Sequence, residues 1–253
     1  MKLYLKIEPL FHNFIMKQIF LAFLAILPGI LISVYIYWRD RKEAEPLRLL
    51  FICFLFGILS VTPAKKLEEF GIYDLFITES KDPLMTFTFA FLIVAFSEEL
   101  MKYIFLRYYI FPQKAFSEPL DGIVYSVAIS MGFATIENFS YVMFSNNAFE
   151  SALEIAYSRM FTAVPAHAVF AVVMGYYIGL ARFNPSKESL YSFVGFLGAV
   201  LLHGTYDFFI FQELSEYLNI FTLFTLVIGL IISKKMINAH KKLSGSAAKP
   251  GTV

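Results

Sequence analysis

Seven stretches of mostly apolar residues divide the chain, and most of its charged residues lie in the segments between them. The stretches are residues 20–38, 49–64, 84–111, 121–144, 160–180, 190–211 and 218–232. A helix needs about 17–25 such residues to cross the hydrocarbon core of a membrane, and the second and last stretches are short by this measure. Proline, asparagine and basic clusters occupy the gaps, as expected at helix ends. The pattern predicts an all-α protein, a polytopic membrane helix bundle of about seven transmembrane helices.

Composition agrees with a membrane location. Hydrophobic residues make up 58% of the 253 residues and charged residues 16%, against about 25% charged in an ordinary soluble domain. This excludes a soluble globular enzyme and makes the lipid bilayer the expected surroundings. The net charge of +1 leaves no large basic surface for nucleic acid. We expect one transmembrane domain over residues 1–243, with a catalytic core at about 84–211, and a disordered tail at 244–253.

The basic residues are unevenly shared between alternate loops. The loops after the odd-numbered stretches, counted together with Arg107 near the end of the third stretch, hold 13 Lys and Arg, and the N-terminal segment with the remaining loops holds 7. Short cytoplasmic loops carry the excess of positive charge in membrane proteins. We therefore expect a multi-pass protein of the cell (inner or plasma) membrane, with its N-terminus outside and its C-terminus in the cytoplasm.

Ionisable side chains other than tyrosine are concentrated in the third to sixth stretches. An ionisable group inside a membrane helix costs about 2.5–3.5 kcal/mol, so such groups persist mainly where they have a function. They include Glu98, Glu99, Lys102, Glu137, His167, His203 and Asp207. At a rise of about 1.5 Å per residue, all of these except Lys102 fall about 18–26 Å from the cytoplasmic end of their helices. This common depth predicts one shared polar cavity, displaced toward the outer face.

The first polar motif pairs two carboxylates with one lysine. Lys102 follows Glu99 by three residues and Glu98 by four, so all three lie within one helical turn. One lysine cannot neutralise two carboxylates. The trio is therefore either a structural ion pair or a site where the second carboxylate accepts a proton from water. Adjacent residues point about 100° apart on a helix, so we expect only one carboxyl to face a reaction centre.

The other motifs supply two histidines and two further carboxylates. Glu137, next to Asn138, has no Lys or Arg in its own helix, so it needs a metal, a histidine, a proton or a cation from another helix. Asp207 follows His203 at i+4 and can orient the imidazole or share an ion with it. With His167, the set Glu137, His167, His203 and Asp207 matches a zinc site. A metal-free mechanism, in which a glutamate activates water and histidines stabilise an oxyanion, fits equally well.

These motifs and their order resemble the PrsW family of polytopic intramembrane proteases, which are distantly similar to type II CAAX prenyl endopeptidases. The resemblance covers about residues 84–210. It is carried by Glu98-Glu99-x-x-Lys102, Phe133-x-x-x-Glu137-Asn138, His167 and His203-x-x-x-Asp207 in successive apolar helices. One departure is Ala171, four residues after His167, where a glycine is often found; both residues are small.

The resemblance implies a peptidase that is proposed to depend on a metal, for which we expect Zn²⁺. Its implied catalytic residues are Glu98, Glu99, His167 and His203, and we expect Lys102, Asn138 and Asp207 to support them. Members of the family are associated with the cleavage of membrane-anchored regulators such as anti-sigma factors. The implied substrate is therefore a single-pass membrane protein, cleaved near the outer leaflet.

Two other classes of protein stay open from the sequence. A proton- or cation-coupled transporter also needs carboxylates and histidines in mid-membrane. Such transporters usually show repeats and broken helices, and neither is clear in this sequence. A noncatalytic scaffold or immunity-type membrane protein is the third class, although the complete polar set argues against it.

Overall fold

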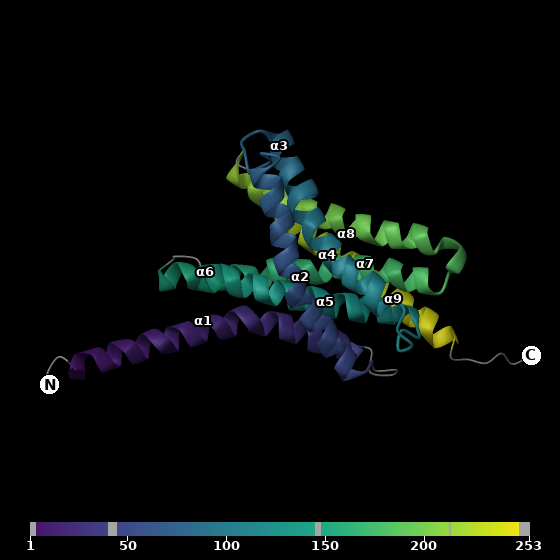
Figure 1. Ribbon diagram of the computed structural model, residues 1–253, viewed down its shortest axis with the longest axis horizontal. Coiled ribbons are helices and arrows are strands. Elements are labelled where there is room, and N and C mark those ends of the chain that lie inside the picture. Colours follow the sequence, from purple (N-terminus) through teal and green to yellow (C-terminus); the bar gives the residue numbers. More distant parts are fainter. Residues whose placement is uncertain (1–3, 40–44, 145–147, 213, 248–253) are drawn as a thin grey trace, which may run out of the picture.

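The computed structural model describes residues 4–39, 45–144, 148–212 and 214–247, and over these residues it is entirely helical (Figure 1). Its α-helices are α1 (Tyr4–Arg39), α2 (Leu47–Tyr73), α3 (Pro83–Thr88), α4 (Phe96–Phe105), α5 (Pro119–Met143), α6 (Phe149–Phe161), α7 (Ala163–Arg182), α8 (Glu188–Phe211) and α9 (Ile220–Ala247). Two π-helical stretches, η1 (Phe89–Ala95) and η2 (Leu106–Ile110), flank α4. Two short 3₁₀ turns, η3 (Pro185–Lys187) and η4 (Glu216–Asn219), precede α8 and α9.

Seven helical segments in the described part of the chain are long and apolar enough to cross a membrane. They are Asn13–Arg39, Leu47–Tyr73, Pro83–Ile110, Pro119–Met143, Phe149–Arg182, Pro185–Phe211 and Glu216–Leu243. The predicted all-α polytopic fold is thereby confirmed. The single domain over residues 1–243 and the direction of the chain across the membrane stay predictions.

The second and last helices are longer than predicted. α2 continues through Pro63 and past Lys65 to Tyr73, because Lys65 lies 2.8 Å from Glu68 one turn later and the helix pairs these two charges itself. α9 continues to Ala247, so residues 244–247 of the predicted disordered tail are helical. Residues 248–253 lie outside the described residues.

The fifth stretch is also more complex than predicted. It consists of α7 and a preceding helix, α6, in a segment that we had placed in a loop. The two helices meet at Thr162, where the backbone leaves the helical conformation (φ −120°, ψ −71°). Pro165 explains the break, because its ring would clash with the carbonyl of Phe161 in a continuous helix. At the third position of α7, by contrast, its missing N–H is not needed.

The two π-helical stretches continue the third membrane segment without a break, so that the segment runs from Pro83 to Ile110. Single turns of π-helix inside α-helices are frequent at functional sites. Here they enclose α4, the helix that carries Glu98 and Glu99.

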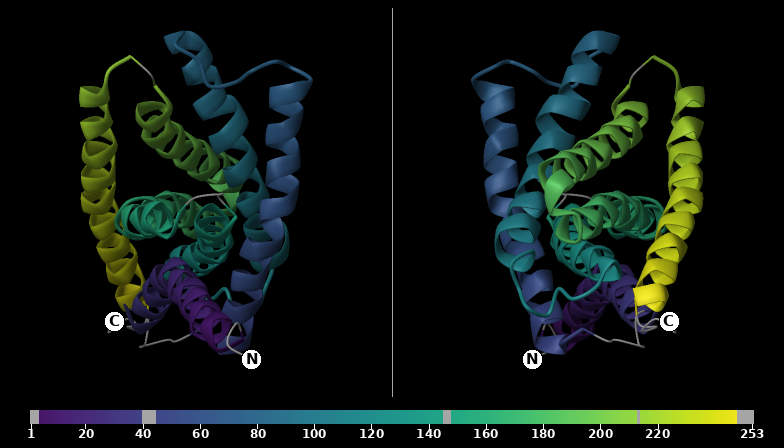
Figure 2. Two further views of the ribbon diagram at one scale, coloured as in Figure 1. Left: turned by 90° about the vertical axis from the view of Figure 1, so that its left-hand side faces the viewer. Right: turned by 90° about the vertical axis from the view of Figure 1, so that its right-hand side faces the viewer.

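α5 is the centre of the bundle and packs against α1, α2 and α7. Figure 1 shows α1, α5, α6 and α7 along the long axis of the molecule, with α2, α4 and α9 crossing them. In the two views of Figure 2, α2 and α9 flank the molecule on opposite sides. The apolar core between α5 and α7 includes the buried side chains of Tyr125, Ile129, Phe170 and Met174.

Glycines allow α5 to touch its neighbours backbone to backbone. A Cβ atom added to Gly132 of α5 would lie 1.9 Å from the carbonyl oxygen of Phe54 in α2. A Cβ added to Gly175 of α7 would lie 2.3 Å from the carbonyl oxygen of Gly122 in α5. Small residues at such crossings are the usual way for membrane helices to approach closely.

We expect Gly132→Ala to destabilise the protein, because the added methyl group meets a backbone atom that cannot rotate away. Overpacking of this kind costs about 1–3 kcal/mol, which should lower the melting temperature in detergent by several degrees. Gly198→Ala is the matched control, because its Cβ would meet only Cγ1 of Val173, at 3.0 Å. Equal melting temperatures for the two variants would contradict the close contact of α2 and α5.

Candidate active site

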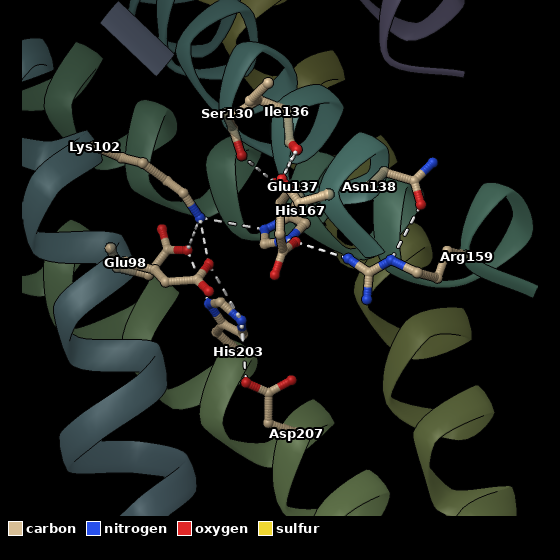
Figure 3. A network of polar contacts seen from close by, with 12 residues as sticks. Glu98, Lys102, Ser130, Ile136, Glu137, Asn138, Arg159, His167, His203 and Asp207 are labelled. Atoms are coloured by element: carbon tan, nitrogen blue, oxygen red, sulfur yellow. Dashed lines mark hydrogen bonds and ion pairs between the residues drawn. The ribbon is translucent and has the colours of Figure 1, made fainter. Parts of the chain in front are cut away.

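Four helices bring the predicted polar residues into one buried group, and a fifth helix adds Arg159 (Figure 3). α4 supplies Glu98, Glu99 and Lys102, α7 supplies His167, α8 supplies His203 and Asp207, α5 supplies Glu137 and Asn138, and α6 supplies Arg159. The common depth predicted from the sequence therefore corresponds to a real cluster. Arg159 is its unpredicted member.

Lys102 lies between the two glutamates. Its Nζ atom is 2.8 Å from Oε1 of Glu99 and 3.3 Å from Oε2 of Glu98, and all three side chains are at most 3% exposed. The ammonium group also lies 4.1 Å from the centre of the Phe133 ring, at cation–π distance. The shared lysine expected from the spacing is thus present, and one cation serves two buried carboxylates.

Each histidine is held by a carboxylate on its Nε2 atom. Nε2 of His203 lies 3.2 Å from Asp207, and Nε2 of His167 lies 3.0 Å from Glu137. The Nδ1 atoms face the α4 motif: that of His203 is 3.0 Å from Glu99 Oε1, and that of His167 is 3.2 Å from the Lys102 ammonium. Carboxylates that orient imidazoles in this way are typical of metal sites.

Arg159 is the cation that Glu137 requires. It donates from Nη2 to Glu137 at 2.8 Å and from Nε to Oδ1 of Asn138 at 3.1 Å. Asn138 in turn donates to the carbonyl oxygen of Ala25 in α1, at 2.8 Å. The sequence contained a signal for this pair, because Arg159 is the one basic residue between Glu137 and His167. We missed it because we had placed residue 159 in a loop.

The buried group fits a divalent metal ion in composition and charge. One ligand atom from each of Glu98, Glu99, His167 and His203 lies within 4.8 Å of the others. Two imidazoles with carboxylates are a ligand set that suits zinc. Oε2 of Glu99 is buried and has no hydrogen-bond partner among the described residues. A bound metal ion would give this oxygen a partner.

The net charge of the cluster also favours a divalent metal ion. The cluster holds the four carboxylates of Glu98, Glu99, Glu137 and Asp207 against two cations, so with neutral imidazoles its net charge is −2. A divalent cation would balance it. Glu137 and Asp207, which we predicted as ligands with the two histidines, contact the far nitrogens of those histidines and are not in the four-residue group.

A cavity of about 230 Å³ reaches the cluster. Its walls include Glu98, Glu137 and the two histidines, whereas Glu99 is not among its lining residues. This agrees with the expectation that only one of two adjacent carboxyls faces a reaction centre. The cavity has room for several water molecules beside Glu98.

The comparison with known proteins assigns the chain to a family. Residues 45–233 match the model of the PrsW family intramembrane metalloproteases. The chain belongs to the PrsW family. It is 34% identical to the protease PrsW of Geobacillus kaustophilus over 200 residues, which cover 78% of this chain and 84% of the relative. The PrsW proteases of Clostridioides difficile and Bacillus subtilis are each 33% identical, over 88% and 83% of this chain and 94% and 92% of the relatives. No solved structure matches the chain.

Membership of the PrsW family decides between the classes left open by the sequence. The protein is a protease, and therefore a hydrolase. It is a multi-pass membrane protein, and its substrate is a protein. The transporter and the noncatalytic scaffold are therefore rejected. The match to the PrsW model also extends beyond residues 84–210, into α2 and α9, so the predicted extent of the resemblance was too narrow.

We expect Lys102→Met to lower the amount of folded protein, because it leaves two buried carboxylates without their common cation. Breaking a buried ion pair costs about 3–5 kcal/mol. The double variant Lys102→Met with Glu99→Gln removes one of those charges and should recover part of the loss. Folded yield in detergent, measured by size exclusion, is the readout, and Lys66→Met, at an exposed position of α2, is the control. A single variant that accumulates like the control would show that Lys102 does not balance this cluster.

Proposed function

We propose that this PrsW-family protease hydrolyses a peptide bond in a single-pass membrane protein, with Glu98, Glu99, His167 and His203 in its active site. The observation that carries the proposal is the convergence of these buried side chains beside one cavity. The family resemblance adds an anti-sigma-factor-like regulator as substrate. The uneven distribution of basic residues supports an outside N-terminus, and with it cleavage near the outer leaflet.

Glu98 is the proposed general base. It lines the cavity, where water can reach it. Its cation contact to Lys102, at 3.3 Å, is longer than the 2.8 Å contact of Glu99 to the same atom. A carboxylate beside water, with a long contact to its cation, is the better placed of the two to take a proton from water.

Glu99, His167 and His203 are the residues proposed to hold a zinc ion. Glu99 offers its unpartnered Oε2, and the histidines turn Nδ1 toward the α4 motif while carboxylates hold Nε2. Bound zinc polarises a carbonyl group and activates water. The chain itself orients the two rings: Asp207 and Glu137 would accept the Nε2 protons of His203 and His167, so that each Nδ1 atom would offer its lone pair to the metal ion.

Glu98→Gln should abolish proteolysis while the protein stays folded, because glutamine keeps the volume of glutamate and loses the proton acceptor. The expected fall in rate is about a hundredfold to ten-thousandfold. The assay uses protein in liposomes together with a library of single-pass model substrates. The substrate sequences are randomised around one end of the membrane-spanning helix, and mass spectrometry identifies the cleavage products. Glu69→Gln, at an exposed position of α2, is the control.

Wild-type protein that cleaves no member of the library would count against the proposed substrate class. Cleavage by Glu98→Gln at the wild-type rate, with folding unchanged, would remove Glu98 from the mechanism.

Purified protein should carry about one equivalent of zinc, measured by mass spectrometry of the metal, and His203→Ala should lose it. The control is His240→Ala, because His240 is a buried histidine of α9 that lies outside the cluster. Metal-free protein that still cleaves substrate would contradict the zinc proposal. It would favour the mechanism in which glutamate activates water and the histidines stabilise the oxyanion.

A further inference from the structure

The cavity extends beyond the active-site residues to a corner formed by α2 and its neighbours. Lys65 and Glu68 of α2 line this corner, together with Glu79 from the segment after α2. Glu68 is only 7% exposed, although the next residue, Glu69, is exposed. One face of α2 therefore buries Glu68 at the cavity, beside the half-exposed Lys65.

Glu68 has one oxygen without a partner. Its Oε2 accepts a hydrogen bond from Lys65 at 2.8 Å, whereas its Oε1 is buried and has no hydrogen-bond partner among the described residues. A buried carboxylate oxygen without a donor is unfavourable, because it has lost its hydrogen bonds to water and no protein donor replaces them. Such an atom beside a cavity indicates that a donor arrives from outside the chain.

An aromatic wall stands next to this carboxylate. Phe89 of η1 and Phe211 of α8 line the same cavity, and their rings are 5.4 Å apart. Ile72, which follows Glu68 by one helical turn, and Phe211 both pack against the apolar cluster that contains Phe89. An apolar wall that ends at a carboxylate matches a side chain with an apolar stem and a cationic head, which is the chemistry of Lys and Arg.

The charges of the corner favour the same ligand. Lys65 supplies one positive charge, and Glu68 and Glu79 supply two negative charges, so the corner is negative overall. Glu79 is exposed and lies at the rim, where it would attract a cation toward Glu68. A Lys or Arg near the end of a membrane helix can bring its charged head to the interface along its apolar stem.

We propose that Lys65, Glu68, Glu79, Phe89 and Phe211 form a substrate subsite that binds one Lys or Arg side chain near the scissile bond. Glu68 Oε1 accepts its hydrogen bond, Lys65 fixes the Glu68 carboxylate, and the two rings contact the apolar stem. The subsite rests on the proposed function, because it serves only a peptide substrate. It makes Glu68 a specificity-determining residue of the protease.

The test compares matched single-pass substrates that carry Lys, Met or Gln at one position at a time around the cleaved bond. Wild-type protein in liposomes should prefer Lys to Met about tenfold in kcat/KM at one position, as expected for a charge-assisted hydrogen bond. Glu68→Gln should bring this ratio close to one. Glu69→Gln, on the exposed face of the same helix turn, should keep the wild-type ratio.

A second pair of variants keeps the proposal testable if Glu68→Gln does not accumulate. Lys65→Met frees both oxygens of Glu68, so it should raise the preference for Lys, whereas Lys66→Met, at an exposed position, should not. Equal cleavage of the Lys and Met substrates by wild-type protein at every position would overturn the subsite and leave the proposed function intact. In that case water satisfies Glu68. No cleavage of any substrate would overturn both.

Discussion

A charged side chain inside a bundle surrounded by lipid has too little water to solvate it, so side chains on other helices have to balance its charge. The polar cluster follows this constraint throughout. Lys102 is shared by the two carboxylates of α4, Arg159 reaches Glu137 from another helix, and His203 links Asp207 to the diglutamate. The contacts of Lys102 lie within α4 and that of His203 with Asp207 lies within α8, whereas the remaining contacts join different helices. The cluster therefore fixes the relative positions of α4 to α8. With neutral imidazoles it keeps a net charge of −2, which a divalent cation would balance.

The helices meet these requirements because α5 and α7 are held in a fixed register. Gly122 touches Gly175 backbone to backbone, and eight residues further along α5 Ser130 donates to the carbonyl oxygen of His167, eight residues earlier in α7. An antiparallel pair keeps this correspondence along its length. Glu137, seven residues beyond Ser130, then lies opposite the segment that contains Arg159, which is where the ion pair forms. A seam of small residues near one end of the helices thus determines the pairing of charges at the other.

Hydropathy predicted the number of spans, and the rise of a helix predicted that polar residues of four spans come together, because both follow from positions along apolar runs. It failed where charge was taken as the end of a span. Arg159 lies in a helix, α6, where its charge is balanced by Glu137 of α5. Glu68 was placed in a loop, although α2 continues and its ion pair with Lys65 faces the cavity. A contact between helices decides the first case, and a single sequence does not contain it. The second case is an i,i+3 pair within α2, whose spacing is present in the sequence.

The need for charge balance also gives a reason for two adjacent glutamates where one general base would suffice. Glu99 accepts from Lys102 through its Oε1, which also lies 3.0 Å from Nδ1 of His203, and Glu99 does not line the cavity. A carboxylate held in this way is poorly placed to take a proton from water. Glu98, turned about 100° from it on the helix, lines the cavity. In the mechanism that we propose, one glutamate therefore holds the lysine and the histidine in place, and its neighbour is left free to act on water.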